Sequence, residues 1–268
     1  MKEPALRYAN LSLPPEAPDR LRELAEAFSQ SVLTLTEGDA PVAWSCHNGL
    51  PGSLRATAFV WVMPAARRRG LGSALLRETF ARMAAHGVAE ALVHVEEDDG
   101  AGAAFLLKNG MSRSFSTLHM VYPGGPMPLS VVFEPYRDAD YEGFRALQSA
   151  AFYDLRRSIG LAPYSIPLSP ALRAAMAAAA DRYFLLRDGG QIVAGGSTFE
   201  DEVDDVAVYA PYRGRGLGAA VVARAVNDLL ARGVTPGLWC VDGNPARKLY
   251  LRLGFHPAER VVYYRKKL

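Results

Sequence analysis

The chain has 268 residues, of which half are apolar and 22% are charged, so it is long enough for two globular domains with substantial cores. Its net charge of +2 is too small to indicate nucleic acid or an anionic membrane as a partner. Two distant cysteines and five histidines without metal-ligand spacing predict reduced thiols and no metal. We expect a cytoplasmic protein, because neither a signal peptide nor a membrane span is evident.

In chain order, the first half begins with an amphipathic helix in residues 18–31, where apolar residues recur three and four positions apart. A strand-like run at 59–62 then leads into the sequence ARRRGLGSALL, after which an apolar face predicts a helix. A short buried strand follows at 91–95. Prolines and glycines are crowded into PGGPMPLS at 123–130, which predicts a linker.

The second half repeats this order. It contains a helix at 139–153 and a hairpin at 182–199 with an Asp-Gly-Gly turn, and a strand at 206–208 then leads into the sequence YRGRGLGAAVV. The arginine–glycine sequence recurs at a spacing of 146 residues, which is the size of a domain and too long for a solenoid repeat. We therefore predict an α/β fold with two tandem domains, residues 1–124 and 129–268.

The recurring sequence places glycines where a strand ends and a helix begins. The first N–H groups of a helix have no partner within it and lie at the positive end of its dipole. Gly216 would let a ligand approach the backbone, Gly218 would allow close packing, and Arg213 and Arg215 add positive charge. These features predict a phosphate or pyrophosphate site. A P-loop is excluded because no lysine follows, and Ala219 replaces the third glycine of a dinucleotide fingerprint.

The pattern Arg-x-x-Gly-x-Gly after a V-x-V strand resembles the acyl-CoA loop of the GNAT (GCN5-related) N-acetyltransferases. It occurs twice, beginning at Arg67 and at Arg213. The second half also contains NPARKLYLRLGF at 244–255, which is similar to the second signature of that family. The resemblance covers residues 131–268 well and 1–122 in outline. It implies two tandem GNAT-like domains, each a mixed, mostly antiparallel sheet flanked by helices.

The resemblance also implies how acetyl-CoA would be held. The strand would bind the pantetheine arm through its backbone, the loop would bind the pyrophosphate, and an asparagine would contact the cofactor. In the second half the expected cofactor-binding residues are Val206, Ala207, Val208, Arg213, Gly214, Arg215, Gly216, Leu217, Gly218, Ala219 and Asn244. In the first half they are Val62, Arg67, Arg69, Gly70 and Gly72.

Two side chains are candidates for the chemistry. By resemblance, the hydroxyl of Tyr250 points at the sulfur, and a phenol in that position can protonate the thiolate that an amine expels from a thioester. Glu202 stands roughly where some family members carry a glutamate base. Strand alternation would place Glu202 and Asp204 on the same face as Val206 and Val208. Other relatives use ordered water, so both routes to a neutral amine stay open.

The first half departs from the second signature. When the two halves are aligned on the glycine that follows the last helix, Gly100 replaces the asparagine and Leu106 replaces the tyrosine. At the spacing of the loops, Ala56 replaces the glutamate. This half therefore resembles the degenerate half of tandem family members, which binds cofactor or only supports the fold. In the second half, residues 154–176 would lie over the acceptor site by the same analogy.

We therefore expect the C-terminal domain to transfer an acetyl group from acetyl-CoA to a primary amine by direct attack. The expected acceptor is a small molecule rather than a protein, and the expected state is a monomer or homodimer. Two alternatives stay open. A non-catalytic acyl-CoA sensor or scaffold would bind the cofactor without turnover, and an interaction protein with vestigial sites would not bind it.

Overall fold

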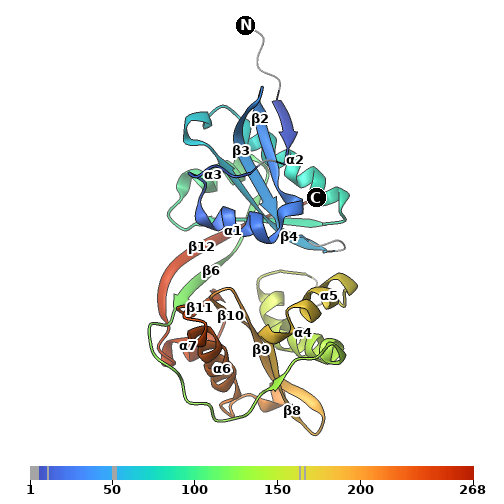
Figure 1. Cartoon of the computed structure of the whole chain (residues 1–268), viewed down its shortest axis with the longest axis vertical. Helices are drawn as coiled ribbons and strands as arrows, with labels where there is room; N and C mark the ends of the chain where they lie inside the picture. The colour runs from blue at the N-terminus through green and yellow to red at the C-terminus, as the bar shows by residue number, and fades with distance from the viewer. Residues whose placement is uncertain (1–5, 11, 50–52, 163, 166) are drawn as a thin grey trace. The chain divides into compact units, whose positions relative to one another are not determined.

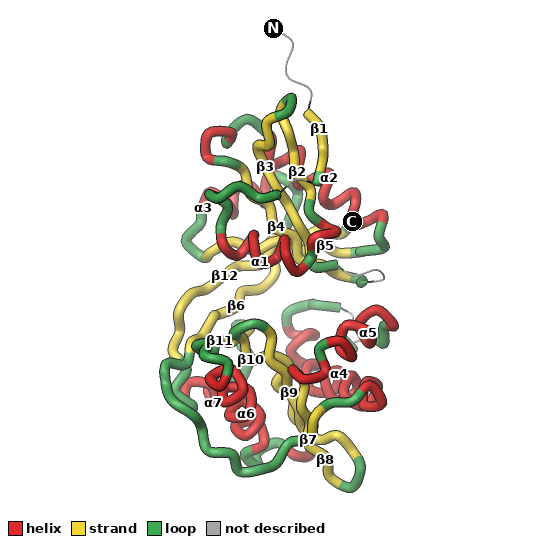
Figure 2. The backbone as a smooth tube through the Cα atoms, viewed as in Figure 1, coloured by secondary structure: helices red, strands yellow, loops and turns green. Residues whose placement is uncertain are grey.

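The structure is a computed structural model that describes residues 6–10, 12–49, 53–162, 164–165 and 167–268 (Figure 1). The chain forms two compact units, the first made of residues 1–114 and 262–268 and the second of residues 115–261. Each unit is a mixed, mostly antiparallel sheet with helices on its faces (Figure 2), which confirms the predicted fold class. In the described part of the chain, no helix combines the length and the apolar character needed to cross a membrane.

The sheet of the first unit has the order β1-β2-β3-β4-β5-β12. Its strands are β1 (Leu6–Ala9), β2 (Leu33–Glu37), β3 (Ala40–His47), β4 (Arg55–Val62), β5 (Glu90–Glu96) and the end of β12 (His256–Lys267), and its helices are α1 (Asp19–Ala27), α2 (Leu71–Ala85) and α3 (Gly100–Lys108). Ala43 packs in the core under α2, whereas its neighbour Trp44 packs in the core under α1. The two helices therefore cover opposite faces of the sheet, because successive strand residues point to opposite sides.

The sheet of the second unit has the order β12-β6-β11-β10-β9-β8-β7. Its strands are β6 (Ser112–Val121), β7 (Glu134–Pro135), β8 (Tyr183–Asp188), β9 (Gln191–Phe199), β10 (Glu202–Val208), β11 (Gly237–Val241) and the start of β12, and its helices are α4 (Tyr141–Ser158), α5 (Pro170–Ala178), α6 (Leu217–Ala231) and α7 (Arg247–Arg252). Helix α6 packs on one face, where Val221 and Leu229 are fully buried, and α4 packs on the other.

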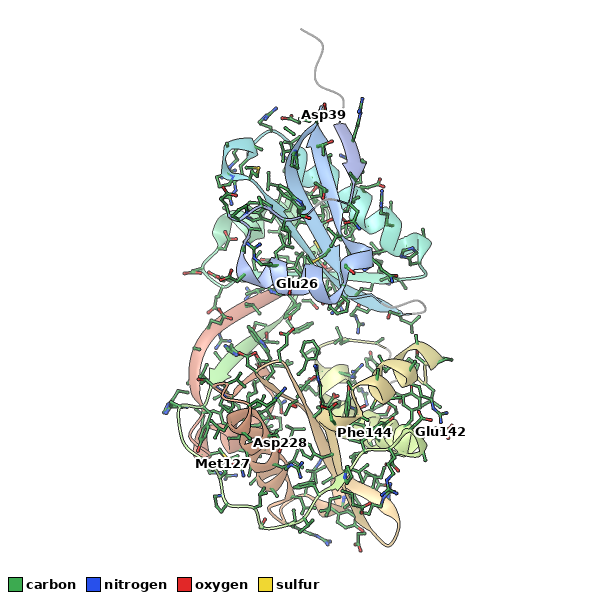
Figure 3. All side chains as sticks on the ribbon, in the orientation of Figure 1. Glu26, Asp39, Met127, Glu142, Phe144 and Asp228 are labelled. Atoms are coloured by element: carbon green, nitrogen blue, oxygen red, sulfur yellow. The ribbon has the colours of Figure 1, made fainter. Side chains whose placement is uncertain are left out.

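The apolar face of α4 explains why this helix packs on the sheet. Phe144 and Leu147 are buried against the sheet, whereas Glu142 lies on the outer side of the helix (Figure 3). Burial of each large apolar side chain contributes about 1.5–3 kcal/mol. This face holds α4 firmly on β9 and β10, and its C-terminal end then reaches the site described below.

The last strand of each half contributes to both units. Residues 115–121 of β6 belong to the second unit, where residues 117–121 pair antiparallel with β11, and residues 262–268 belong to the first unit. The units therefore divide the chain differently from the predicted consecutive domains, 1–124 and 129–268. The proline–glycine segment at 123–130 indicates a connection, but nothing in such a segment specifies which sheet the preceding strand joins.

Candidate active site

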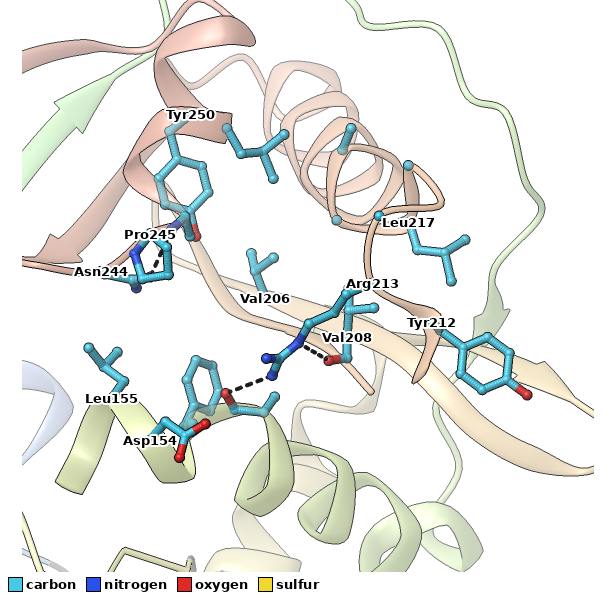
Figure 4. A pocket seen from close by; sticks show the side chains of 18 of the residues that line it. Asp154, Leu155, Val206, Val208, Tyr212, Arg213, Leu217, Asn244, Pro245 and Tyr250 are labelled. Atoms are coloured by element: carbon cyan, nitrogen blue, oxygen red, sulfur yellow. Dashed lines mark hydrogen bonds between the residues drawn. The ribbon is translucent and has the colours of Figure 1, made fainter. Parts of the chain in front are cut away.

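The site lies where two parallel strands of the second unit separate. β10 and β11 pair in register only at Glu202 and Gly237, although β10 continues to Val208 and β11 to Val241. A groove of about 840 Å³ opens at the separated ends (Figure 4). α6, α7 and the end of α4 complete its walls. A pocket of this size is typical of ligand sites, and the separated strand offers backbone groups to a ligand.

The glycine loop forms one end of the groove. Gly214 and Gly216 adopt φ values of +78° and +82°, a conformation that favours glycine. Gly216 is the N-cap of α6, and no side chain caps this helix. The N–H groups of its first turn therefore face the groove as donors for an anion, at the positive end of the helix dipole.

The two arginines of the loop have different surroundings. Arg213 lines the groove, where its guanidinium donates hydrogen bonds of 3.3 Å to the carbonyls of Val208 and Ala151 (Figure 4). Arg215 lies over the ring of Tyr212, at 4.9 Å from its centroid. Arg213 is therefore the loop arginine that lines the groove, together with Arg252 of α7, whereas Arg215 packs on the ring of Tyr212.

The groove brings together most of the residues expected from the sequence. Those that line it are Val206, Val208, Arg213, Gly214, Gly216, Leu217, Gly218, Ala219, Asn244 and Tyr250. Ala207 is buried under α4, and neither Glu202 nor Arg215 lines the groove. Gly218 packs closely, because a Cβ atom there would lie 3.2 Å from the side chain of Leu249.

Asn244 and Tyr250 approach the groove from the segment around α7. The Oδ1 atom of Asn244 accepts the N–H of Ala246 at 2.9 Å, so the side chain also organises the turn before the helix. Tyr250 projects from α7 toward Asn244 and Pro245 (Figure 4), and its side chain is only 7% exposed. Burial raises the pKa of Tyr250, and the charges of Cys240 and Asp204 raise it further. The phenol therefore stays protonated at neutral pH and can donate a proton.

A second cavity of about 240 Å³ adjoins the groove. The two share Phe152, Leu155, Val206, Asn244 and Tyr250. The second cavity extends along the C-terminal end of α4 to Leu161, so part of the segment predicted to cover an acceptor does line it. Tyr250 thus lines both the long groove and the small cavity.

A β-bulge in β10 changes the faces that strand alternation predicts. The register with β9 shifts between Asp204 and Ala207, and Asp205 adopts a φ of +53°. Val203 and Val206 pack on the α6 side, whereas Ala207 lies in the core under α4. The prediction that Glu202 and Asp204 share a face with Val206 and Val208 was therefore wrong, because the extra residue of the bulge inverts the alternation.

Two consecutive carboxylates occupy the bulge and line the smaller cavity. The Oδ1 atom of Asp204 accepts the N–H of Asp205 at 2.8 Å, and Ser197 donates to Asp205 at 3.4 Å. Asp204 is exposed to solvent by its surface area, although many protein atoms surround its carboxylate. Burial, followed by the charge of Asp205, raises the pKa of Asp204 to about 7. A carboxylate of this kind can accept a proton near neutral pH.

Glu202 is held away from both cavities by a residue that sequence reasoning missed. Its Oε1 atom lies 3.0 Å from Nε2 of His119 on β6, and the imidazole stacks on Trp239 with a centroid distance of 4.7 Å. The hydrogen bond to Glu202 raises the pKa of His119. No local signal could have indicated this contact, because β6 precedes β10 by most of a domain.

The first unit repeats the loop but not the tyrosine. Gly70 has the same φ of +82° as Gly216, and Arg67 donates to the carbonyl of Val62 at 3.0 Å, as Arg213 does to Val208. β4 and β5 also pair only at their first positions. Leu106 occupies the position of Tyr250. The N–H of Met111 bonds to the carbonyl of Leu106, just as the N–H of Phe255 bonds to the carbonyl of Tyr250.

Three residues of the first loop are constrained in different ways. Arg69 pairs with Glu37 at 2.5 Å, and a Cβ atom on Gly72 would lie 3.2 Å from the side chain of Val62 and 3.3 Å from Phe105. Arg68 adopts a φ of +64° where the second loop has glycine. The loop conformation is preserved, and the acid is absent.

Comparison with known proteins identifies the class to which this chain belongs. The acetyltransferase (GNAT) family matches residues 5–111 and 149–255, so the chain belongs to the GNAT family, in which acetyl-CoA is the usual donor. Both halves are matched, which confirms a tandem member and a transferase.

Individual relatives agree with this assignment. A mycothiol acetyltransferase of Clavibacter michiganensis is 28% identical over 78% of this chain and 72% of its own. A GCN5-related N-acetyltransferase of Sphaerobacter thermophilus shares the fold with a TM-score of 0.68 and 18% identity, over 94% of this chain and 86% of that one. A tandem GNAT protein from the clavulanic acid biosynthesis pathway has a TM-score of 0.59 and 18% identity, over 88% and 82%.

Metal ligands are not gathered in the described ranges of the chain, where no group of three or more histidine, cysteine or acidic residues could hold an ion. Cys240 is buried, and burial raises the pKa of its thiol to about 11. This thiol is therefore protonated at neutral pH and does not serve as a nucleophile.

Proposed function

We propose that the second unit transfers an acetyl group from acetyl-CoA to the primary amine of a small molecule by direct attack. One observation carries this proposal: a long groove and a small cavity adjoin, and the same buried tyrosine lines both. A two-substrate transfer without a covalent enzyme intermediate needs this arrangement, because both reactants must reach one point together.

The groove has the features that acetyl-CoA requires. The first-turn N–H groups of α6 and the guanidinium of Arg213 form an electropositive end suited to a pyrophosphate. The separated strand presents the backbone of Val206 to Val208 toward an amide-containing arm. With the phosphates at the loop, the thioester would lie toward Tyr250.

Tyr250 supplies the proton in this proposal. An amine that attacks the thioester expels a thiolate, and a phenol within hydrogen-bond reach can protonate it. The raised pKa of Tyr250 keeps the hydroxyl protonated until that moment. Glu202, the base expected from the sequence, is engaged by His119, so this arrangement favours a different carboxylate as the base.

Two observations support a small acceptor. The second cavity has a volume of about 240 Å³, and the chain is similar to a mycothiol acetyltransferase. The first unit keeps the loop and has Leu106 at the position of the acid, which supports a role for it in cofactor binding or in the fold alone.

Calorimetric titration with acetyl-CoA tests the proposal. Gly216→Glu should abolish binding to the second unit, because a carboxylate would then lie at the N-terminus of α6. Gly70→Glu is the matched control, since this residue has the same φ of +82° and nothing within 4 Å of a Cβ atom. Binding that Gly216→Glu leaves intact would place the cofactor elsewhere, and two binding events would show that the first loop also functions. Binding without release of CoA in the presence of any amine would support a sensor instead.

A further inference from the structure

The smaller cavity carries a further inference about the acceptor, which rests on the proposed function. Its walls combine apolar and charged side chains. Phe152, Leu155, Ile159 and Leu161 come from α4 and the turn after it, Trp239 comes from β11, and the charged side chains are Arg156, Asp204 and Asp205. Trp239 is 39% exposed, so its indole is available to a ligand. A cavity of about 240 Å³ with such walls suits a compact apolar group.

Trp239 is fixed in place from behind. His119 stacks on the indole with an interplanar angle of 30°, and Glu202 binds the imidazole at 3.0 Å. This chain of contacts holds the indole as a rigid wall. Glu202 and His119 are positioning residues for Trp239.

Asp204 is the carboxylate of this cavity that remains available to a ligand. Among the described residues, its side chain accepts only the N–H of Asp205 and forms no ion pair. Asp205 is more constrained, because Ser197 donates to it and Arg145 and Arg156 act on it from α4.

Several charged or titratable groups surround the carboxylate pair. Asp205 and Glu202 on β10 act directly on Asp204, Arg145 and Arg156 act on Asp205, and Tyr183 and Tyr250 are influenced by Asp204. The charges that act directly on Asp204 are thus negative, and the cation that lines the same cavity, Arg156, acts on Asp205. An ammonium group would relieve the repulsion between the two carboxylates, whereas an anionic acceptor would increase it.

We propose that Asp204 binds and deprotonates the ammonium group of the acceptor, and that the acceptor is an apolar primary amine with a single positive charge. The ammonium would meet Asp204 while its carbon skeleton lies against Trp239 and the apolar side chains of α4. Because the cavity and the groove share Tyr250, the nitrogen would then lie close to the thioester.

The proton balance of the step is simple. Asp204 takes one proton from the ammonium, which frees the nitrogen lone pair. Asp204 later releases this proton to solvent. The nitrogen forms a bond to the thioester carbon, and the carbon–sulfur bond breaks. Tyr250 gives its proton to the departing sulfur and regains one from the nitrogen, so the products are an amide, a thiol and one proton in solution.

The acceptor class is tested by CoA release from the full chain, with 2-phenylethylamine and hexylamine compared with spermidine and glucosamine. The expected result is a kcat/KM at least tenfold higher for the two apolar monoamines. No turnover of the monoamines, or an equal or higher kcat/KM for spermidine or glucosamine, would overturn the proposal. A chain that fails to bind acetyl-CoA in the calorimeter would instead refute the proposed function.

The role of Asp204 is tested by Asp204→Asn with Asp201→Asn as the matched control. Asp201 is exposed and lines neither cavity. Asp204→Asn should lower kcat/KM for 2-phenylethylamine about 10²-fold or more, remove the rise in activity between pH 6 and 8, and leave the Kd for acetyl-CoA unchanged. Retention of the pH profile in Asp204→Asn, or an equal loss in Asp201→Asn, would show that Asp204 is not the base.

Discussion

Asp204 on β10 and Tyr250 on α7 line the same small cavity, and both have raised pKa values. Burial is the main cause in each case. The charge of Asp204 is among the influences that raise the pKa of Tyr250. A carboxylate that titrates near neutral pH and a phenol that stays protonated are suited to opposite roles, one accepting and the other donating a proton.

Replacing the tyrosine separates catalysis from binding. Tyr250→Phe should lower kcat about 10²-fold, because the thiolate would leave without its proton, and the Kd for acetyl-CoA should change by less than about twofold. Steady-state CoA release and calorimetry measure the two quantities. Tyr153→Phe is the control, since Tyr153 lies on α4 and lines neither cavity. If kcat of Tyr250→Phe were unchanged at every pH, Tyr250 would not be the general acid.

The loop arginine should contribute to donor affinity. Arg213→Gln should weaken acetyl-CoA binding about tenfold, which corresponds to about 1.4 kcal/mol, because the groove would lose the cation at its glycine loop. The wild-type affinity should also fall with added salt more steeply than that of the variant. Arg67→Gln makes the same change in the first loop and should have no effect if only the second loop binds. Equal effects of the two variants would indicate two functional loops.

The bulge carboxylate should make stability depend on pH. Because the folded-state pKa of Asp204 is about 7 and its ordinary value is 3.8, ionisation is disfavoured in the native state. The wild-type free energy of unfolding should therefore decline as pH rises from 4 through 7. The Asp204→Asn variant has no carboxylate to ionise at this position. The difference between its Tm and that of the wild type should therefore become more favourable to the variant as pH rises from 4 through 7. A constant difference in Tm between pH 4 and 8 would contradict the raised pKa.

The His119–Glu202 pair should make stability fall with pH in the same direction, but over a higher pH range. The hydrogen bond to Glu202 raises the pKa of His119 above 6.5, so the stabilisation is present below 6.5 and is lost as pH rises through the raised value. Glu202→Gln should lower the His119 pKa in an NMR titration. Its deficit in unfolding free energy should be larger at pH 6 than at pH 8.5. An unshifted titration in the variant would contradict the pairing.

Strand β9, which pairs with the bulged strand β10, should not tolerate an added methyl group at Gly196. A Cβ atom on Gly196 would lie 2.7 Å from the side chain of Val221, so Gly196→Ala should lower the free energy of unfolding by about 1–3 kcal/mol. Gly125→Ala is the control, because nothing lies within 4 Å of its Cβ position. Denaturant titration of both variants checks this. Equal stability of the two would mean that α6 can shift away from β9.

The sequence by itself determined the local parts of this protein. The two arginine–glycine loops, the helices after them and the Asp188-Gly189-Gly190 hairpin turn follow from short-range backbone preferences. Spacing alone was enough to show that the unit occurs twice. The family assignment was also readable, because both of its signatures are short contiguous segments.

The tertiary structure decided which side chains meet. Strand alternation predicted the wrong face for Glu202 and Asp204, because a bulge depends on the pairing with β9. His119 reaches Glu202 only because β6 joins the sheet of the second unit, beside β11. Sheet pairing is a long-range property of the chain, and no pattern of neighbouring residues encodes it. The loop and the tyrosine could therefore be proposed from sequence, whereas the acceptor cavity with Asp204 and Trp239 required the fold.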